Sequence, residues 1–300
     1  MTKVLEVKGL QKNFGKFQAL KDIDLEIESG EVLGYVGPNG AGKSTTIRTL
    51  LGIIKATGGS AKIFGKDVWT DAIEIHKDIA YVPGDVYLWP NLTGGEIIDT
   101  FLHMHGKFDA TKRDELIKKF EFDPKKKSRS YSKGNRQKVA LIAALASTAE
   151  LYIFDEPTSG LDPLMEAIFQ EEVARIKSEG KAILLSSHIL SEVERLCDKI
   201  AIIAAGEIVE YGSLEEMRHL TRYEFKVETA KPLGNSLSSI AAIHDIKFDE
   251  HNANKVAFQA DSDKIQEVLT ALLAYDVVKI DSNPQTLEEL FMHHYSQGRG

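Results

Sequence analysis

Short, uninterrupted apolar runs recur along the first two thirds of the chain, and a stretch with helical periodicity follows each of them. The runs predict strands that are buried on both faces of a sheet, and they are Gly30–Gly37, Asp78–Pro83, Leu151–Glu156 and Ala182–His188. The predicted helices are Lys43–Leu51, Lys133–Ser147, Pro163–Ser178 and Leu190–Leu196. Strands that alternate with helices in this order are typical of an α/β domain with a largely parallel sheet.

Two segments of this region depart from the alternation. The opening segment contains the stretch DIDLEIE, in which apolar and charged residues alternate, and this period of two predicts an antiparallel β ribbon. The segment from about Asp85 to Ala149 is rich in helical pattern and is interrupted by the turn signals TGG and DPKKK. It predicts a helical subdomain, residues 85–149, inserted between two strands of the core.

The pattern changes after about Leu220, where the elements become short. The expected strands are RYEFKVE, DIKFDE, KVAFQA and VVKID, and the expected helices between them are Ser236–Ile243 and Asp261–Ala274. This β-α-β-β-α-β order is the ferredoxin-like pattern. A closing helix is expected at Thr286–Tyr295. The chain therefore divides into a large domain, residues 1–220, and a small α+β accessory domain, residues 221–300.

Composition places the chain among globular proteins, with 43% hydrophobic and 27% charged residues. The net charge of −8 argues against a surface that grips nucleic acid. The single cysteine, Cys197, excludes an intrachain disulfide and favours a reducing, cytosolic compartment. The longest apolar runs, such as Val139–Ala146, are shorter than the roughly 20 residues of a membrane-spanning helix. If the protein serves a membrane process, the membrane-spanning part is therefore expected on another polypeptide.

The strongest chemical signal lies directly after the first apolar run. Residues 37–44 read G-P-N-G-A-G-K-S, which matches the P-loop pattern G-x-x-x-x-G-K-[ST] between a strand and a helix. Such a loop wraps its backbone amides around phosphates at a helix N-terminus. Lys43 is expected to reach the β- and γ-phosphates of ATP, and the Ser44 hydroxyl is expected to bind Mg²⁺. The predicted ATP-binding residues of the loop are Gly37, Pro38, Asn39, Gly40, Ala41, Gly42, Lys43, Ser44 and Thr45.

Two carboxylates end the third apolar run, at Asp155 and Glu156. Taken alone, an acidic pair at the end of a strand is more often a helix cap or a solvated turn. Together with a P-loop, the pair predicts a catalytic site, in which Asp155 holds Mg²⁺ through water and Glu156 acts as general base on the attacking water.

Several further motifs of the chain resemble those of one protein family. Tyr131–Gln137 reads Y-S-K-G-N-R-Q and resembles the signature motif of the ATP-binding cassette (ABC) ATPases. Asp155–Asp162, D-E-P-T-S-G-L-D, is similar to that family's joined Walker B motif and D-loop. Ser186–His188 resembles its switch histidine segment, and Phe14 lies where the family stacks an aromatic ring on adenine. The resemblance covers roughly the first 220 residues, with all motifs in order.

The resemblance implies a role for each of these residues. Two copies would pair head to tail and enclose two ATP molecules. Ser132, Gly134 and Asn135 would bind the ATP held by the opposite subunit, in trans. His188 would contact the γ-phosphate as a catalytic residue with Glu156 and Lys43, and Asp162 would couple the two sites across the dimer.

One position departs from the family pattern in a way that bears on catalysis. After the strand at Asp78–Pro83 the family has a glutamine that contacts Mg²⁺ and water, whereas this chain has Gly84 followed by Asp85. Asp85 is therefore a further candidate metal ligand. The missing side chain predicts slower or differently coupled hydrolysis, not inactivity, because Lys43, Glu156 and His188 are all present.

The leading hypothesis is an ATPase that powers export as the ATP-binding subunit of an ABC transporter, peripheral on the cytoplasmic face of the cell membrane. Its cofactors would be ATP and Mg²⁺, and its partners an integral-membrane transporter subunit on a separate chain and a second ATPase subunit, identical or paired. The end of the chain, Leu287–Tyr295, is similar to the ends of exporter-type ATPases. Asp85–Glu121 is the expected docking surface, and cargo specificity is expected to lie in the membrane subunit.

The alternative is a soluble ABC ATPase that acts in translation, repair or assembly without transport. Members of that kind usually carry a second cassette or a long coiled-coil insertion, and this sequence shows neither. A third hypothesis gives the C-terminal domain a ligand-sensing role, although no polar cluster in it identifies a ligand.

Overall fold

The fold is that of a computed structural model, which describes residues 2–219, 222–232, 237, 240–249 and 252–284. Its contacts divide the chain into two compact units, Met1–Tyr211 and Gly212–Gly300. The division falls a few residues before the boundary that the sequence suggested at Leu220. Each unit has a hydrophobic core of its own.

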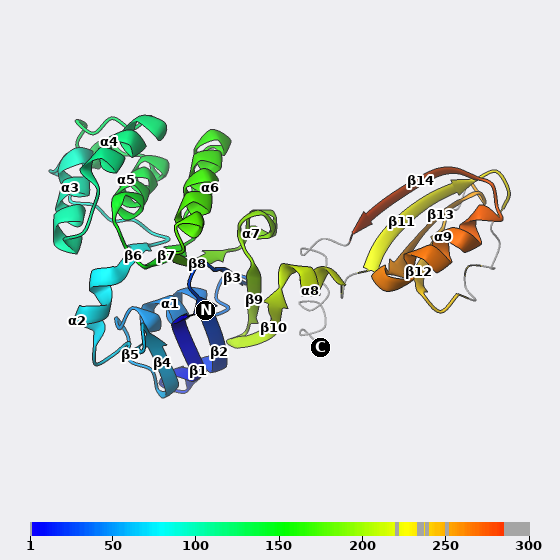
Figure 1. The fold of residues 1–300 in the computed structure, drawn as a ribbon, viewed down its shortest axis with the longest axis horizontal. Coiled ribbons are helices and arrows are strands. Elements are labelled where there is room, and N and C mark those ends of the chain that lie inside the picture. The colour runs from blue at the N-terminus through cyan, green and yellow to red at the C-terminus, as the bar shows by residue number, and fades with distance from the viewer. Residues whose placement is uncertain (1, 220–221, 233–236, 238–239, 250–251, 285–300) are drawn as a thin grey trace. The chain divides into compact units, whose positions relative to one another are not determined.

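The first unit is built on a six-stranded sheet (Figure 1). In spatial order its strands are β10 (Glu207–Ser213), β9 (Lys199–Ala204), β3 (Val32–Val36), β8 (Ala182–Ser187), β7 (Leu151–Asp155) and β6 (Ile79–Val82). The pairs from β9 to β6 are parallel. Every residue of β3, β7 and β8 is buried, which is why these strands read as unbroken apolar runs. The four parallel strands predicted from the sequence are confirmed.

A second, antiparallel sheet covers one side of this core. Its strands are β2 (Phe17–Glu28), β1 (Lys3–Phe14), β4 (Gly58–Ile63) and β5 (Lys66–Asp67), so the predicted ribbon is confirmed. Helix α1 (Lys43–Leu50) belongs to the core that joins the two sheets. Its buried Ile47 shares that core with Leu25 of β2 and Ile153 of β7. The helix that follows the P-loop is therefore held by apolar contacts to both sheets.

The helical subdomain consists of α3 (Gly94–His105), α4 (Ala110–Lys119) and α5 (Lys133–Ala146), which pack against one another (Figure 1). Thr93 and Glu96 form a capping box that starts α3. The core adds α6 (Pro163–Ser178) and α7 (Leu190–Leu196), and Phe169 of α6 packs edge-on against Phe154 of β7. Shorter elements are α2 (Ala72–Ile75) and the 3₁₀ turns His76–Asp78, Ser128–Ser130 and Ser262–Lys264. Among the described residues, no helix combines the length and apolar character that a membrane-spanning segment needs.

The second unit contains a four-stranded antiparallel sheet of order β12-β13-β11-β14. Its elements are α8 (Leu214–His219), β11 (Arg222–Thr229), β12 (Ile243–Phe248), β13 (Lys255–Asp261), α9 (Ile265–Leu273) and β14 (Val277–Pro284). This strand order is that of a ferredoxin-like sheet. Val268 and Leu272 of α9 pack with Phe225 and Phe258 of the sheet.

One helix predicted in this unit is not formed as expected. Residues 240–242 form a turn and Ile243 begins β12, so the C-terminal half of the predicted helix Ser236–Ile243 is wrong. The error arose because the apolar residues around Ala242 fit a helical period, whereas their burial comes from the core of the sheet. Most of the N-terminal half lies outside the described residues, as does the predicted closing helix Thr286–Tyr295.

Candidate functional site

The chemical residues of the first unit meet at one edge of its parallel sheet. Val36 is paired with Ser187, Asp155 with Ser186, and Val82 with Phe154, so four neighbouring strands end at the same level. The segments that leave these ends are the P-loop, the switch histidine segment, the acidic pair and the Gly84 segment. Crevices beyond the carboxyl ends of parallel strands are the usual ligand sites of α/β folds.

The P-loop owes its shape to glycines at positions that disfavour a side chain. Gly40 and Gly42 have φ angles of +83° and +120°, in the region that disfavours side chains. A Cβ atom at Gly37 would lie 2.3 Å from the carbonyl oxygen of Ile203. Gly42 precedes the first residue of α1, so the loop directs its backbone amides and the helix N-terminus into the same space.

Lys43 is the buried cation of this loop, with a side chain only 6% exposed. Its Nζ donates to the carbonyl oxygens of Gly37, at 2.5 Å, and Pro38, at 3.4 Å. It also lies 3.4 Å from Oε1 of Glu156. The P-loop and the acidic pair are therefore joined by one ion pair, which the sequence alone did not reveal.

Asp155 is almost fully buried at the end of β7. Burial is the main reason that the pKa of its carboxyl lies above the ordinary value, and hydrogen bonds from Ser186 and Ser44 partly oppose that shift. The Ser186 hydroxyl donates to Oδ1 at 2.9 Å. Ser44 and Asp155 thus place two oxygen donors side by side, which fits Mg²⁺, a cation that binds oxygen ligands.

Glu156 has a φ angle of +53°, a left-handed conformation that is unusual for a residue other than glycine. Its backbone N–H donates to the carbonyl oxygen of Ser186 at 2.9 Å. Its carboxylate forms a hydrogen bond with Nδ1 of His188 as well as the ion pair with Lys43. The three residues predicted to be catalytic therefore lie together, with Glu156 in contact with both of the others.

These groups line a pocket of about 770 Å³. The predicted site residues that line it are Phe14, Pro38, Asn39, Gly40, Gly42, Lys43, Ser44, Thr45, Asp85, Asp155, Glu156 and His188. Gly37 and Ala41 are buried and lie outside the lining. Phe14 stands at the end of β1, half exposed, opposite Phe17 in the β1–β2 hairpin.

Sequence reasoning missed several residues of the lining. Phe17 could have been found as the hairpin partner of Phe14, and Arg48 lies one helical turn after Ser44. Tyr81 had no signal in the sequence, because it approaches the site only through the pairing of β6 with β7. Burial, and then the negative charge of Asp155, raises the pKa of Tyr81 to about 12. The lining also includes Ala19, Pro83, Tyr87, Lys133 and Ser159.

Besides Gly37 and Ala41, four predicted site residues do not line this pocket: Ser132, Gly134, Asn135 and Asp162. Ser132 is the N-cap of α5, with its hydroxyl accepting from the Asn135 amide at 3.3 Å, and Asp162 is the N-cap of α6.

The two helix starts are in contact with each other. A Cβ atom on Gly134 would lie 2.4 Å from the carbonyl oxygen of Gly160. The ammonium of Lys133 donates to the Ser159 hydroxyl at 2.7 Å. The signature segment and the D-loop therefore form one surface.

Comparison with known proteins now identifies the family. The sequence profile of the ABC transporter family matches residues 20–159. An uncharacterised ABC transporter ATP-binding protein of Bacillus subtilis, YdbJ, is 31% identical over 96% of this chain and 94% of its own length. The chain belongs to the ABC transporter ATP-binding proteins. NatA of Bacillus subtilis is 36% identical over 69% of the chain and 87% of its own length.

Other relatives of this ABC protein are longer. An ABC transporter ATP-binding protein of Synechocystis, sll0415, is 38% identical over 67% of the chain, and the match spans 58% of that protein. The solved structure of an ATP-binding subunit of an ABC transporter is 32% identical, covers 72% of this chain and has a TM-score of 0.67. The cassette MJ0796, solved as a dimer after hydrolysis with ADP and phosphate bound, is 25% identical with a TM-score of 0.64 and covers 70% of the chain. The ABC ATPase fold and the assignment as an ATP-hydrolysing enzyme are thereby confirmed.

The buried carboxylate of this ABC protein leads to a prediction about stability. Because burial raises the pKa of Asp155, its charge costs folding free energy at every pH above that pKa, and the cost disappears as the group is protonated. Asp155→Asn should therefore raise the melting temperature of the nucleotide-free protein at pH 7, by about 2–4 °C. The gain should shrink as the pH falls toward the ordinary range of a carboxyl group. The variant should also lose the Mg²⁺-dependent part of the stabilisation by ATP.

The measurement is a thermal melt with ATP, in magnesium and in EDTA. Asp85→Asn is the matched control, because Asp85 lines the same pocket but is exposed. If Asp85→Asn, and not Asp155→Asn, loses the Mg²⁺-dependent part of the stabilisation by ATP, then Asp85 is the metal ligand. A melting temperature that falls in Asp155→Asn would show that the charge is stabilising.

Proposed function

We propose that this chain hydrolyses MgATP as one of two cassettes on the cytoplasmic face of a membrane, and that it powers export through a membrane subunit on a separate chain. The observation that carries the proposal is that Glu156 contacts both Lys43 and His188 at the mouth of a phosphate-binding loop. These three groups supply the cation, the base and the partner of the base that hydrolysis needs.

The chemistry assigned to the pocket follows from its contacts. The P-loop amides and Lys43 would hold the β- and γ-phosphates, and Ser44 and Asp155 would hold Mg²⁺, which would neutralise charge that develops on the phosphates. When phosphate oxygens compete for Lys43, the Glu156 carboxylate is released to accept a proton from the attacking water. His188 keeps that carboxylate oriented through Nδ1, which leaves Nε2 for the γ-phosphate.

A second copy of the chain would complete each site. At the start of α5 only Lys133 lines the subunit's own pocket, whereas Ser132, Gly134 and Asn135 lie outside it, at the positive end of a helix of 14 residues. Such an end stabilises a phosphate that approaches from another molecule. We assign Ser132, Gly134 and Asn135 to the ATP of the partner, and Asp162 to the coupling of the two sites.

The surface proposed for the membrane subunit is an apolar groove of about 290 Å³ between β6 and the helical subdomain. It is lined by Val86, Phe101 and alanines of α5, and the 86% exposed Tyr87 stands at its edge. Tyr81, Pro83 and Tyr87 line both this groove and the ATP pocket. A helix of the membrane subunit that fills the groove would touch the same segment that borders the nucleotide, which couples transport to hydrolysis.

Gly84 lies in this shared segment and gives a first test. A Cβ atom on Gly84 would lie 3.3 Å from the carbonyl oxygen of Asp155, so a longer side chain is admitted with a small shift. Gly84→Gln should raise the ATP turnover number, by about tenfold or less, because the added amide positions water beside Mg²⁺. Gly84→Ala, which adds only a methyl group, is the control. An unchanged rate in a folded Gln variant would contradict the inference that Gly84 slows hydrolysis.

The membrane partner gives the second test. Glu156→Gln removes the base while keeping the shape of the side chain, so it should trap the ATP-bound dimer together with whatever it drives. Purification of this variant from gently solubilised membranes of the native host should recover a multi-span membrane protein, identified by mass spectrometry. Lys43→Ala, which should bind ATP weakly, is the control and should recover much less of it. Recovery of ribosomes or soluble partners alone would favour a non-transport ATPase.

A further inference from the structure

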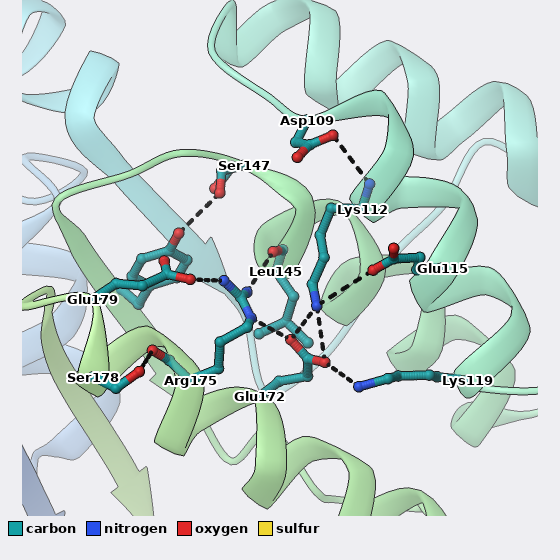
Figure 2. Close-up of polar contacts among 11 residues, drawn as sticks. Asp109, Lys112, Glu115, Lys119, Leu145, Ser147, Glu172, Arg175, Ser178 and Glu179 are labelled. Carbon is teal, nitrogen blue, oxygen red and sulfur yellow. Dashed lines mark hydrogen bonds and ion pairs between the residues drawn. The ribbon is translucent and has the colours of Figure 1, made fainter.

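An ion cluster around one buried carboxylate lies where the helical subdomain meets α6 of the core (Figure 2), and none of its residues lines the ATP pocket. Its centre is Glu172 of α6, whose side chain is only 1% exposed. Lys112 and Lys119 of α4 approach its carboxylate at 3.1 Å and 2.9 Å, and Arg175 of α6 approaches it at 2.7 Å. One carboxylate is thus shared by three cations from two helices.

The adjacent residue shows that this burial is specific to one position. Glu171 is exposed, although it is the same residue type on the same helix. Burial alone would raise the pKa of the Glu172 carboxyl, but the hydrogen bonds from Lys119, Arg175 and Lys112 outweigh it and hold the pKa below its ordinary value. The carboxylate is therefore charged and fully partnered, the condition under which a buried ion group holds elements in one geometry.

The cluster extends to the signature helix. The Arg175 guanidinium donates to the carbonyl oxygen of Leu145, at the C-terminal end of α5, at 3.3 Å. Lys138 of α5 donates to the carbonyl oxygen of Phe120, which ends α4, at 2.8 Å. Polar contacts therefore join α4 to α6, α5 to α6 and α4 to α5.

Helices α5 and α6 are also tied at their N-terminal ends. Lys133 and Ser159 join the start of α5 to the D-loop, which leads to Asp162 at the start of α6. Phe169, three residues before Glu172 on α6, packs on Phe154 of the strand that carries the acidic pair. Helix α6 consequently connects the catalytic strand, the D-loop and the helical subdomain.

We propose that the Glu172 cluster (Glu172, Lys112, Lys119 and Arg175) is a positioning device that makes α4, α5 and α6 move as one body, so that the signature segment and the D-loop meet the partner subunit in a fixed relation. The proposal rests on the head-to-tail dimer proposed above. Glu172 touches neither ATP nor Mg²⁺ and acts only through the helices it joins. Loss of the cluster should therefore weaken dimer closure and leave ATP binding to the separate subunit unchanged.

The experiment compares neighbouring substitutions in the full-length chain carrying Glu156→Gln. ATP-dependent dimerisation is measured by sedimentation velocity, and ATP affinity of the monomer by titration with a fluorescent ATP analogue at low protein concentration. Glu172→Gln should raise the dimer dissociation constant about tenfold and leave the affinity for the analogue within about twofold. Glu171→Gln is the matched control and should change neither.

A second variant guards against a simple loss of stability. Lys112→Met with Lys119→Met removes the link between α4 and α6, keeps the apolar stems of the side chains and leaves Glu172 paired with Arg175. Measured well below its melting temperature, it should weaken dimerisation in the same way. If this variant loses binding of the ATP analogue as strongly as it loses dimerisation, the cluster only stabilises the fold and the proposal is wrong.

The outcomes separate this inference from the proposed function. If the Glu156→Gln parent stays monomeric with ATP, the dimer itself is wrong and the inference falls with it. If the parent dimerises and the folded Glu172 and Lys112/Lys119 variants dimerise equally well, the inference alone is overturned.

Discussion

The burial of a parallel sheet on both faces is the constraint from which the rest of the first unit follows. Such strands carry few polar side chains along their length, so charged groups are concentrated at the edge where they end. At that edge, Lys43 pairs with Glu156, and Glu156 forms a hydrogen bond with His188. One ion pair and one hydrogen bond thereby join segments from β3, β7 and β8, which are far apart in the chain and adjacent in the sheet.

The same edge concentrates features that oppose folding. Burial raises the pKa of Asp155, and Glu156 adopts a left-handed backbone conformation. Such strain is typical of functional sites. Ser132 and Asp162 lie outside the lining of the pocket, although their neighbours Lys133 and Ser159 belong to it. In the dimer proposed above, the two helix starts would bind the ATP of the partner, and ATP would become part of the contact between the subunits.

Much of this could be predicted because the decisive signals are local. The P-loop, the acidic pair and the apolar strands depend on neighbouring residues, and all were found from the sequence. The Glu172 cluster could not be predicted, since Glu171 and Glu172 read alike and only the approach of α4, some fifty residues earlier, buries one of them. Tyr81 was missed because only the pairing of β6 with β7 brings it to the site. The predicted helix ending at Ile243 failed because a short apolar segment fits either period until its sheet partners are known.

The claim that each ATP site is built from two subunits can be tested by mixing two inactive variants. Lys43→Ala removes the phosphate-binding cation, and Ser132→Arg blocks the start of the signature helix, so each variant alone should show almost no ATPase activity. In a mixed dimer, one site would combine an intact P-loop from one subunit with an intact signature from the other. The account predicts that mixing restores measurable ATP hydrolysis. A mixture that stays as inactive as its components, although mixed dimers form, would contradict it.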